Sequence, residues 1–312
     1  MGLVLAAPFR NLISRFMIVG PLAMILAAGC AAAAQSAADH VNGARAMLYA
    51  REYVTESGPR WVGSPGHAKA EAYIKKQFAK DDLVLDSFTT STPAGLMEMH
   101  NYIVRFPGKK DGVIVLATHY ETNYWLRNIN YVGANDGGST TGLLMEMANH
   151  LRGRKLEGYS VWLVFFDGEE SVTGRWSDSE STYGSRHLAA KWQNDGTLKR
   201  IKAFLLADMV GDKDLDIQRD SNSTAWLLDL VKKAATRYGY QSHFFETETE
   251  DEDDHIPFVK RGVPCADIID LHYGYQNAYW HSAQDTLDKI SGRSLAIVGD
   301  TFLETIRLLN QR

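Results

Sequence analysis

The sequence has 312 residues, of which 45% are hydrophobic and 23% are charged, with 26 glycines and 8 prolines. This composition is that of an ordinary globular protein and excludes collagen-like, low-complexity and disordered chains. The formal charge of -5 comes from 33 basic and 38 acidic residues without a basic cluster, which argues against nucleic acid as a partner. Because single domains of about 200 to 250 residues are common, we expect one folded domain.

The N-terminal thirty residues have the pattern of an export signal. Arg10 and Arg15 precede an apolar run over residues 16–28. This run is too short to cross a bilayer, which requires about 20 residues. We therefore expect a signal peptide over residues 1–30 and an exported protein that is periplasmic, secreted or anchored to a membrane.

The end of this segment leaves two kinds of processing open. The sequence LAAGC at 26–30 resembles a bacterial lipoprotein site with Cys30 as the lipid anchor. Ordinary cleavage within residues 31–38, where small residues also repeat, is the alternative. In both cases Cys265 is the only certain thiol of the mature chain, so we expect no intrachain disulfide.

From residue 39 onward, helical and strand patterns alternate along the chain. Spaced apolar positions predict helices over residues 39–58, 66–80, 140–151, 185–192, 224–238 and 293–309. Short continuous apolar runs predict strands over residues 113–117, 161–166 and 203–206. This alternation predicts an α/β fold, a single-domain α/β/α sandwich over residues 39–312 with a mostly parallel, mixed central sheet.

Residues that follow the predicted strands are rich in metal ligands, at the edge of the sheet where ligand sites form in doubly wound folds. The candidates are His119, Asp136, Glu170, Asp208 and, in a later loop, His281. Asp136, Glu170 and His281 would hold one catalytic zinc ion and leave a coordination position open. His119 and Asp208 would complete a second zinc site, with Asp136 as the bridge.

Glu169 is the candidate acid/base of this site. It directly precedes the candidate ligand Glu170, and a carboxylate beside a metal site can shuttle a proton. Charges that directly follow a strand core are costly unless they are paired, hydrated or bound to metal. Gly137 and Gly138 would allow a sharp bend of the backbone beside Asp136.

Other catalytic signatures fit less well. Residues 133–140 have the glycine spacing of a phosphate loop, but Ser139 stands where the lysine is required. The same stretch lacks the Gly-x-Ser-x-Gly elbow of serine hydrolases. The chain also has no His-Glu-x-x-His motif, which excludes the thermolysin-like zinc site.

Residues 246–254 contain seven acids in nine positions. We expect most of this stretch to be a solvated loop rather than a calcium site. The change to apolar residues at 255–258 indicates that Asp253 and Asp254 enter the fold. Trp280 precedes a candidate ligand and is a candidate for a pocket wall.

Three segments carry a resemblance to a known family. They read FFDGEESVTGRWSDSESTYGSRHLAAKW at 165–192, DDHIPFVKRGVP at 253–264 and WHSAQDTLDKIS at 280–291. Together they resemble the metal-dependent glutaminyl-peptide cyclotransferases of animal type, which share a fold with the co-catalytic zinc aminopeptidases. The similarity extends from about residue 39 to the C-terminus.

The resemblance implies a role for each candidate. It implies zinc binding by Asp136, Glu170 and His281, with Glu169 as the acid/base. It further implies that Asp253 is a hydrogen-bonding catalytic aspartate, or Asp254 if the alignment is shifted by one, and that Asp208 is its partner. Trp280 and Trp176 match aromatic pocket residues.

Two departures from the animal pattern keep the aminopeptidase alternative open. Asp267 follows the Arg-Gly-Val-Pro motif where the animal enzymes have histidine. The cysteine pair of the secreted animal enzymes is also absent, and Thr118 stands beside His119. We therefore expect a zinc-dependent cyclotransferase that converts N-terminal glutamine of peptides to pyroglutamate and releases ammonia. The alternative is an exported di-zinc aminopeptidase. One zinc ion is expected for the cyclotransferase and two for the aminopeptidase, and the protein is expected to be a monomer.

Overall fold

The computed structural model describes residues 1–3, 40–177 and 179–312, and residues His40–Arg312 form one compact unit. Most of the expected signal peptide, including Cys30, lies outside the described residues. Export and lipidation therefore stay predictions. Among the helices that are described, none has both the length and the apolar character needed to cross a membrane.

A six-stranded sheet with the order β1-β2-β4-β3-β5-β8 forms the centre of this unit. Its strands are β1 (Asp82–Thr92), β2 (Gly95–Phe106), β3 (Gly108–His119), β4 (Leu156–Phe166), β5 (Ile201–Asp208) and β8 (Cys265–Ile269). β3 is parallel to β4 and β5, and β5 is parallel to β8, whereas β2 runs antiparallel to β1 and β4. The predicted mixed, mostly parallel sheet is confirmed.

The three predicted strands lie within β3, β4 and β5, but the sequence pattern missed the other three strands of this sheet. β1 is an edge strand with mostly exposed or half-buried side chains, and its apolar run is limited to Leu83, Val84 and Leu85. In β8 the buried Asp267 interrupts the apolar pattern. β1 pairs with β2, which directly follows it in the chain, whereas β2 and β8 also pair with β4 and β5, which lie elsewhere in the sequence.

A small second sheet corrects one prediction. It pairs β6 (Ile217–Asp220) with β7 (Phe244–Thr249), so the first part of the acidic stretch 246–254 is a strand and not a loop. Its side chains after Phe245 are mostly exposed, and the expected solvation is therefore confirmed. Asp253 and Asp254 are buried, as the change of pattern after them predicted.

All six predicted helices are present: α4 has the predicted ends, and the other five have shifted ends. The helices are α2 (Gly43–Ser57), α3 (Pro65–Gln77), α4 (Thr140–Leu151), α5 (Tyr183–Asn194), α6 (Ala225–Arg237), α8 (Gly292–Leu309) and the short α7 (Ile256–Val259), which was not predicted. α3 begins one residue before its predicted start because Ser64 caps it, accepting a hydrogen bond from the His67 amide at 3.0 Å, and Pro65 fits the first helical position.

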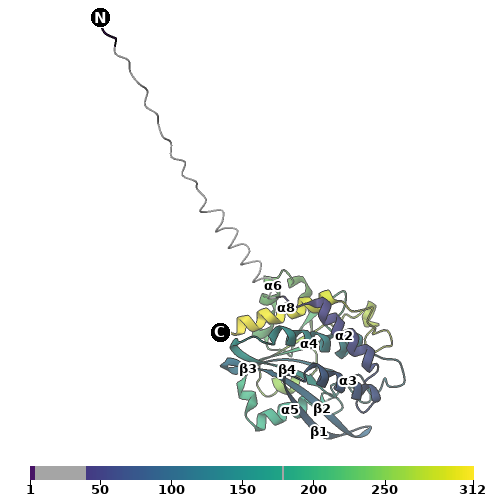
Figure 1. Ribbon diagram of the computed structural model, residues 1–312. Coiled ribbons are helices and arrows are strands. Elements are labelled where there is room, and N and C mark those ends of the chain that lie inside the picture. The colour runs from purple at the N-terminus through teal and green to yellow at the C-terminus, as the bar shows by residue number, and fades with distance from the viewer. Residues whose placement is uncertain (4–39, 178) are drawn as a thin grey trace. The chain divides into compact units, whose positions relative to one another are not determined.

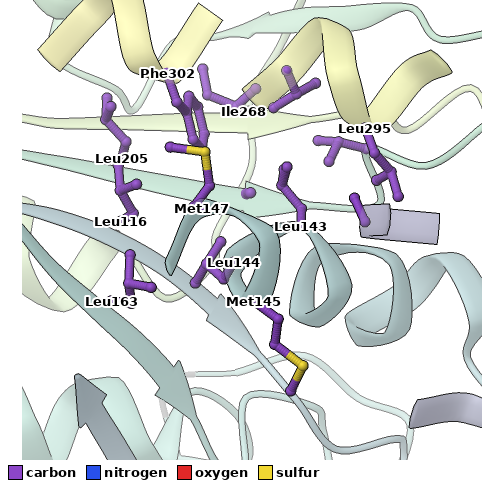
Figure 2. Close-up of a cluster of buried hydrophobic side chains, with 14 of the residues drawn as sticks. Leu116, Leu143, Leu144, Met145, Met147, Leu163, Leu205, Ile268, Leu295 and Phe302 are labelled. Atoms are coloured by element: carbon purple, nitrogen blue, oxygen red, sulfur yellow. The ribbon is translucent and has the colours of Figure 1, made fainter. Parts of the chain in front are cut away.

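Helices cover both faces of the central sheet (Figure 1). On one face, α4 and α8 pack on the strands through buried apolar side chains, as Figure 2 shows for Leu144, Met147 and Phe302, which lie on the same side of Leu116 and Leu205. The alternate residues of the same strands face α5 and α7. Because both faces are covered, polar side chains gather at the ends of the strands, and the predicted α/β/α sandwich is confirmed.

Candidate active site

The carboxyl ends of three adjacent parallel strands bring the predicted residues together. His119 ends β3, the segment with Glu169 and Glu170 follows β4, and Asp208 ends β5. β3 lies between β4 and β5, so His119 occupies the middle of this edge. All four residues are buried, as expected for a site beyond the carboxyl ends of strands.

Asp136 enters the site from the irregular helical turn η1 (Ala134–Ser139), which leads into α4. Gly137 has φ +70°, and a Cβ at this residue would lie 2.9 Å from His119 Cε1, so the predicted bend is confirmed and depends on glycine. The carboxylate of Asp285 fixes the turn by accepting hydrogen bonds from the amides of Asn135 (2.8 Å) and Asp136 (3.2 Å).

Asp136, Glu170 and His281 form a group with the spacing of zinc ligands. His281 Nε2 lies 3.3 Å from Asp136 Oδ2 and 3.3 Å from Glu170 Oε1. Ligands that are 2.0–2.1 Å from a tetrahedral zinc ion lie about 3.3 Å from one another. Apart from this approach of His281 Nε2, the buried Glu170 Oε1 has no polar partner, although burying such an atom is costly. These three residues therefore fit a zinc ion.

A second group shares Asp136. His119 Nε2 lies 2.9 Å from Asp136 Oδ1 and 3.3 Å from Asp208 Oδ1, and candidate ligand atoms of these residues lie within 4.8 Å of one another. The two oxygens of Asp136 thus face different groups. This is the arrangement of a bridging carboxylate in a two-metal site, and equally that of a carboxylate held by a protonated imidazole.

The buried charges shift one another's pKa values strongly. Burial lowers the pKa of His281, but the Glu170 and Asp136 carboxylates raise it to about 10. Burial likewise opposes the charge of His119, yet Asp208 and Glu169 raise its pKa well above the ordinary value. The buried carboxylates therefore give the site a potential that favours cations.

Glu169 has the electrostatic environment of a proton carrier. Burial raises the pKa of its carboxyl well above the ordinary value, and the charges of Asp253 and Glu170 raise it further, while His119 opposes them. Its Oε2 lies 3.8 Å from His119 Nδ1. A raised carboxyl pKa favours holding a proton that can be passed on, as a general acid/base requires.

These groups open into a cavity of about 330 Å³. Its wall includes Glu169, Asp208, Asp253, Trp176 and Trp280, so all the predicted site residues except His119, which lies behind Asp136 and Asp208, line the cavity. Trp176 and Trp280 are 39% and 42% exposed, respectively. One face of the Trp280 indole stacks on the His281 imidazole, with ring centroids 4.1 Å apart, and the exposed parts of both indoles are accessible to a ligand.

Asp253 and its neighbour Asp254 face different surroundings. Asp253 lines the cavity, and burial raises the pKa of its carboxyl well above the ordinary value, with Asp208 adding to the effect. Asp254 is not part of the wall, burial raises the pKa of its carboxyl to about 8, and neither of its carboxylate oxygens has a hydrogen-bond partner. The geometry therefore assigns the cavity position to the first aspartate.

Several residues that hold the site were not found from the sequence. Asn123 donates to Glu170 Oε2, and Tyr131 donates to Asp136 Oδ2 at 2.5 Å. The guanidinium of Arg60 is buried and donates to main-chain carbonyls, including that of Asp136 at 3.0 Å. Only Asp285 had a sequence signal, because it lies in the WHSAQD motif.

Comparisons with known proteins agree with this geometry. The model of peptidase family M28 matches residues 101–306. A glutaminyl-peptide cyclotransferase from Drosophila melanogaster is 30% identical over 273 residues, which cover 77% of this chain and 75% of the relative.

Solved structures give the same relationship. The crystal structure of an Acidobacteriales bacterium glutaminyl cyclase has 62% identity and a TM-score of 0.86, and the match covers 88% of this chain and 96% of that one. A Zn-dependent exopeptidase from Parabacteroides distasonis, with 24% identity, a TM-score of 0.76 and coverage of 88% and 99%, shares the fold. The chain therefore belongs to peptidase family M28 and, within it, to the glutaminyl-peptide cyclotransferases.

Proposed function

We propose that this chain cyclises the N-terminal glutamine of peptides to pyroglutamate and releases ammonia, with one zinc ion held by Asp136, Glu170 and His281. The observation that carries this proposal is the three-residue group with zinc-ligand spacing beside Glu169, in a chain that is 62% identical to a solved glutaminyl cyclase. A bound zinc ion supplies Lewis-acid polarisation of the γ-carboxamide.

Glu169 carries the proton in this proposal. The α-amine of the substrate attacks its own γ-carbonyl carbon, and a C–N bond forms while the bond to the carboxamide nitrogen breaks. Glu169 takes the proton from the attacking amine and gives it to the departing ammonia. Since both nitrogens belong to one molecule, proximity assists the attack and no activated water is required.

Asp253, Asp208 and the two indoles orient the substrate. The buried carboxyls of Asp253 and Asp208 lie in the cavity wall with Glu169. Burial raises the pKa of both carboxyls, so they are suited to share protons with Glu169 and with the substrate's amine. Trp176 and Trp280 provide apolar walls for the side chain of the glutamine.

An aminopeptidase is the second candidate, supported by the group of His119, Asp136 and Asp208. With a second zinc ion in that group, Glu169 would act as the base for a hydrolytic water. We favour the cyclase, in which His119 is protonated and holds Asp136 and Asp208. Its raised pKa suits this role.

Substrate turnover and metal content distinguish the two functions. The purified chain is incubated with Gln-Ala-Ala-amide and with Leu- and Ala-anilides, while ammonia, free amino acids and zinc per chain are measured. The cyclase predicts ammonia release without free amino acids, about one zinc per chain, and loss of activity after chelation that zinc restores. Release of free amino acids with two zinc ions per chain would establish the aminopeptidase instead.

A further inference from the structure

The wall of the catalytic cavity is unusually acidic. More than half of its lining residues are Asp or Glu, and among the described residues no Lys or Arg lines it. The proposed zinc ligands, Glu169 and Asp208 account for the inner part of this charge. The rest comes from Glu250, Asp251, Glu252 and Asp253, four consecutive residues whose acidity the proposed reaction does not require beyond Asp253.

These four residues lead from the interior to the surface. Asp253 is buried and Asp251 is half-buried, whereas Glu250 and Glu252 are exposed. We call Glu250 and Glu252 the acidic lip. Because the lip is exposed and the inner carboxyls lie behind it, an incoming peptide meets the lip charges at the mouth of the cavity.

The size of the cavity determines which part of the peptide reaches the lip. A volume of about 330 Å³ lies at the lower end of the range for small-molecule sites, which is about 300 to 1,000 Å³. Such a cavity accommodates the N-terminal glutamine and little more. The second residue of the peptide must therefore lie at the mouth, beside the lip.

A cationic side chain has two kinds of partner there. Glu250 and Glu252 attract it by charge, and the exposed indole of Trp176 in the same wall offers a cation–π contact. An acidic side chain in this place would be repelled by both carboxylates. Charges that line a concave site also concentrate oppositely charged ligands and speed their association.

We propose that the acidic lip makes this enzyme selective for peptides with a basic residue directly after the N-terminal glutamine. The inference rests on the proposed cyclase function and extends it to a substrate class. The two lip carboxylates attract the lysine side chain of the substrate and repel a glutamate in the same place. We therefore expect kcat/KM to be roughly tenfold higher for Gln-Lys-Ala-amide than for Gln-Glu-Ala-amide at low ionic strength.

A neighbouring cavity would favour an acidic second residue, which is the opposite of the proposed preference. It shares Trp176, Glu252 and Asp253 with the catalytic cavity and is also lined by basic residues, Arg186, Lys260 and Arg261. If the second residue of the substrate were directed there, acidic peptides would be preferred. Such a preference would overturn the proposal.

Matched double variants separate the lip from the overall charge of the segment. E250Q/E252Q removes the lip, while E246Q/E248Q removes the same charge from the same acidic stretch at exposed residues that do not line the cavity. The ratio of kcat/KM for the Lys and Glu peptides is measured for the three proteins at about 20 mM and 500 mM salt. We expect the ratio to fall to within about twofold of unity in E250Q/E252Q and at high salt, and to stay near tenfold in E246Q/E248Q at low salt.

The possible results distinguish failure of the lip proposal from failure of the proposed cyclase function. Equal rates for both peptides in the unmodified protein, or a preference that E250Q/E252Q retains, would overturn the lip proposal while leaving the cyclase function intact. Failure to cyclise any of the peptides, including Gln-Ala-Ala-amide, would instead refute the proposed function itself.

Discussion

Replacement of Glu169 by Gln tests the centre of the proposed mechanism. The change keeps the shape of a side chain that is 5% exposed and removes only its ability to carry a proton. General acid/base catalysis contributes about 10²- to 10⁴-fold to a rate, which corresponds to about 3 to 5 kcal/mol of activation free energy. We expect kcat for a Gln-peptide to fall by that factor.

The structure also predicts what Glu169→Gln leaves unchanged. Glu169 contributes no atom to the group of Asp136, Glu170 and His281, so zinc should stay bound. Burial raises the pKa of the Glu169 carboxyl well above its unfolded value, so burying its charged form destabilises the folded state at high pH. The neutral variant should therefore be as stable as the parent at pH 8, or more stable.

Three measurements on the same sample check this reasoning. Ammonia release gives kcat, elemental analysis gives zinc per chain, and a thermal melt gives Tm. A variant that retains zinc and Tm but also retains near-normal kcat would refute the assigned role. If zinc were lost instead, the assignment of Glu169 as a non-ligand would be wrong.

Two further predictions concern neighbouring carboxyls and pH. Asp253→Asn should lower kcat at least tenfold because Asp253 lines the cavity, whereas Asp254→Asn, its matched control, should change kcat less than threefold; equal losses in steady-state assays would contradict the assignment. His67 Nε2 lies 2.9 Å from Asp167 Oδ1, and although burial lowers its pKa, Asp167 and Glu71 raise it above 6.5. The ion pair therefore stabilises the fold fully below pH 6.5 and less as pH rises through the raised pKa. Urea unfolding should show His67→Gln to be about 3 kcal/mol less stable than the parent at pH 6, with a smaller difference at pH 9; a difference that grows with pH would contradict this account.

The sequence predicted the central layers well because local patterns determine them. Continuous apolar runs identified β3, β4 and β5, and spaced apolar residues identified the helices that cover them. Ligand-type residues at the ends of these strands could be found because parallel strands end at the same edge of a sheet. The same patterns missed β1 and β8, since the exposed edge strand β1 has only a three-residue apolar run and a buried aspartate interrupts the apolar residues of β8.

What the sequence alone determined is therefore which residues are chemically able to form a zinc site and which family's motifs they match. Only the tertiary structure decided how they meet: that Asp136 faces His119 with one oxygen and His281 with the other, and that Asp253 rather than Asp254 lines the cavity. It also revealed Asn123 and Arg60, which hold Glu170 and the Asp136 turn. The physical reason is that these contacts join segments far apart in the chain, and their geometry depends on packing across the whole sheet, which no local pattern records.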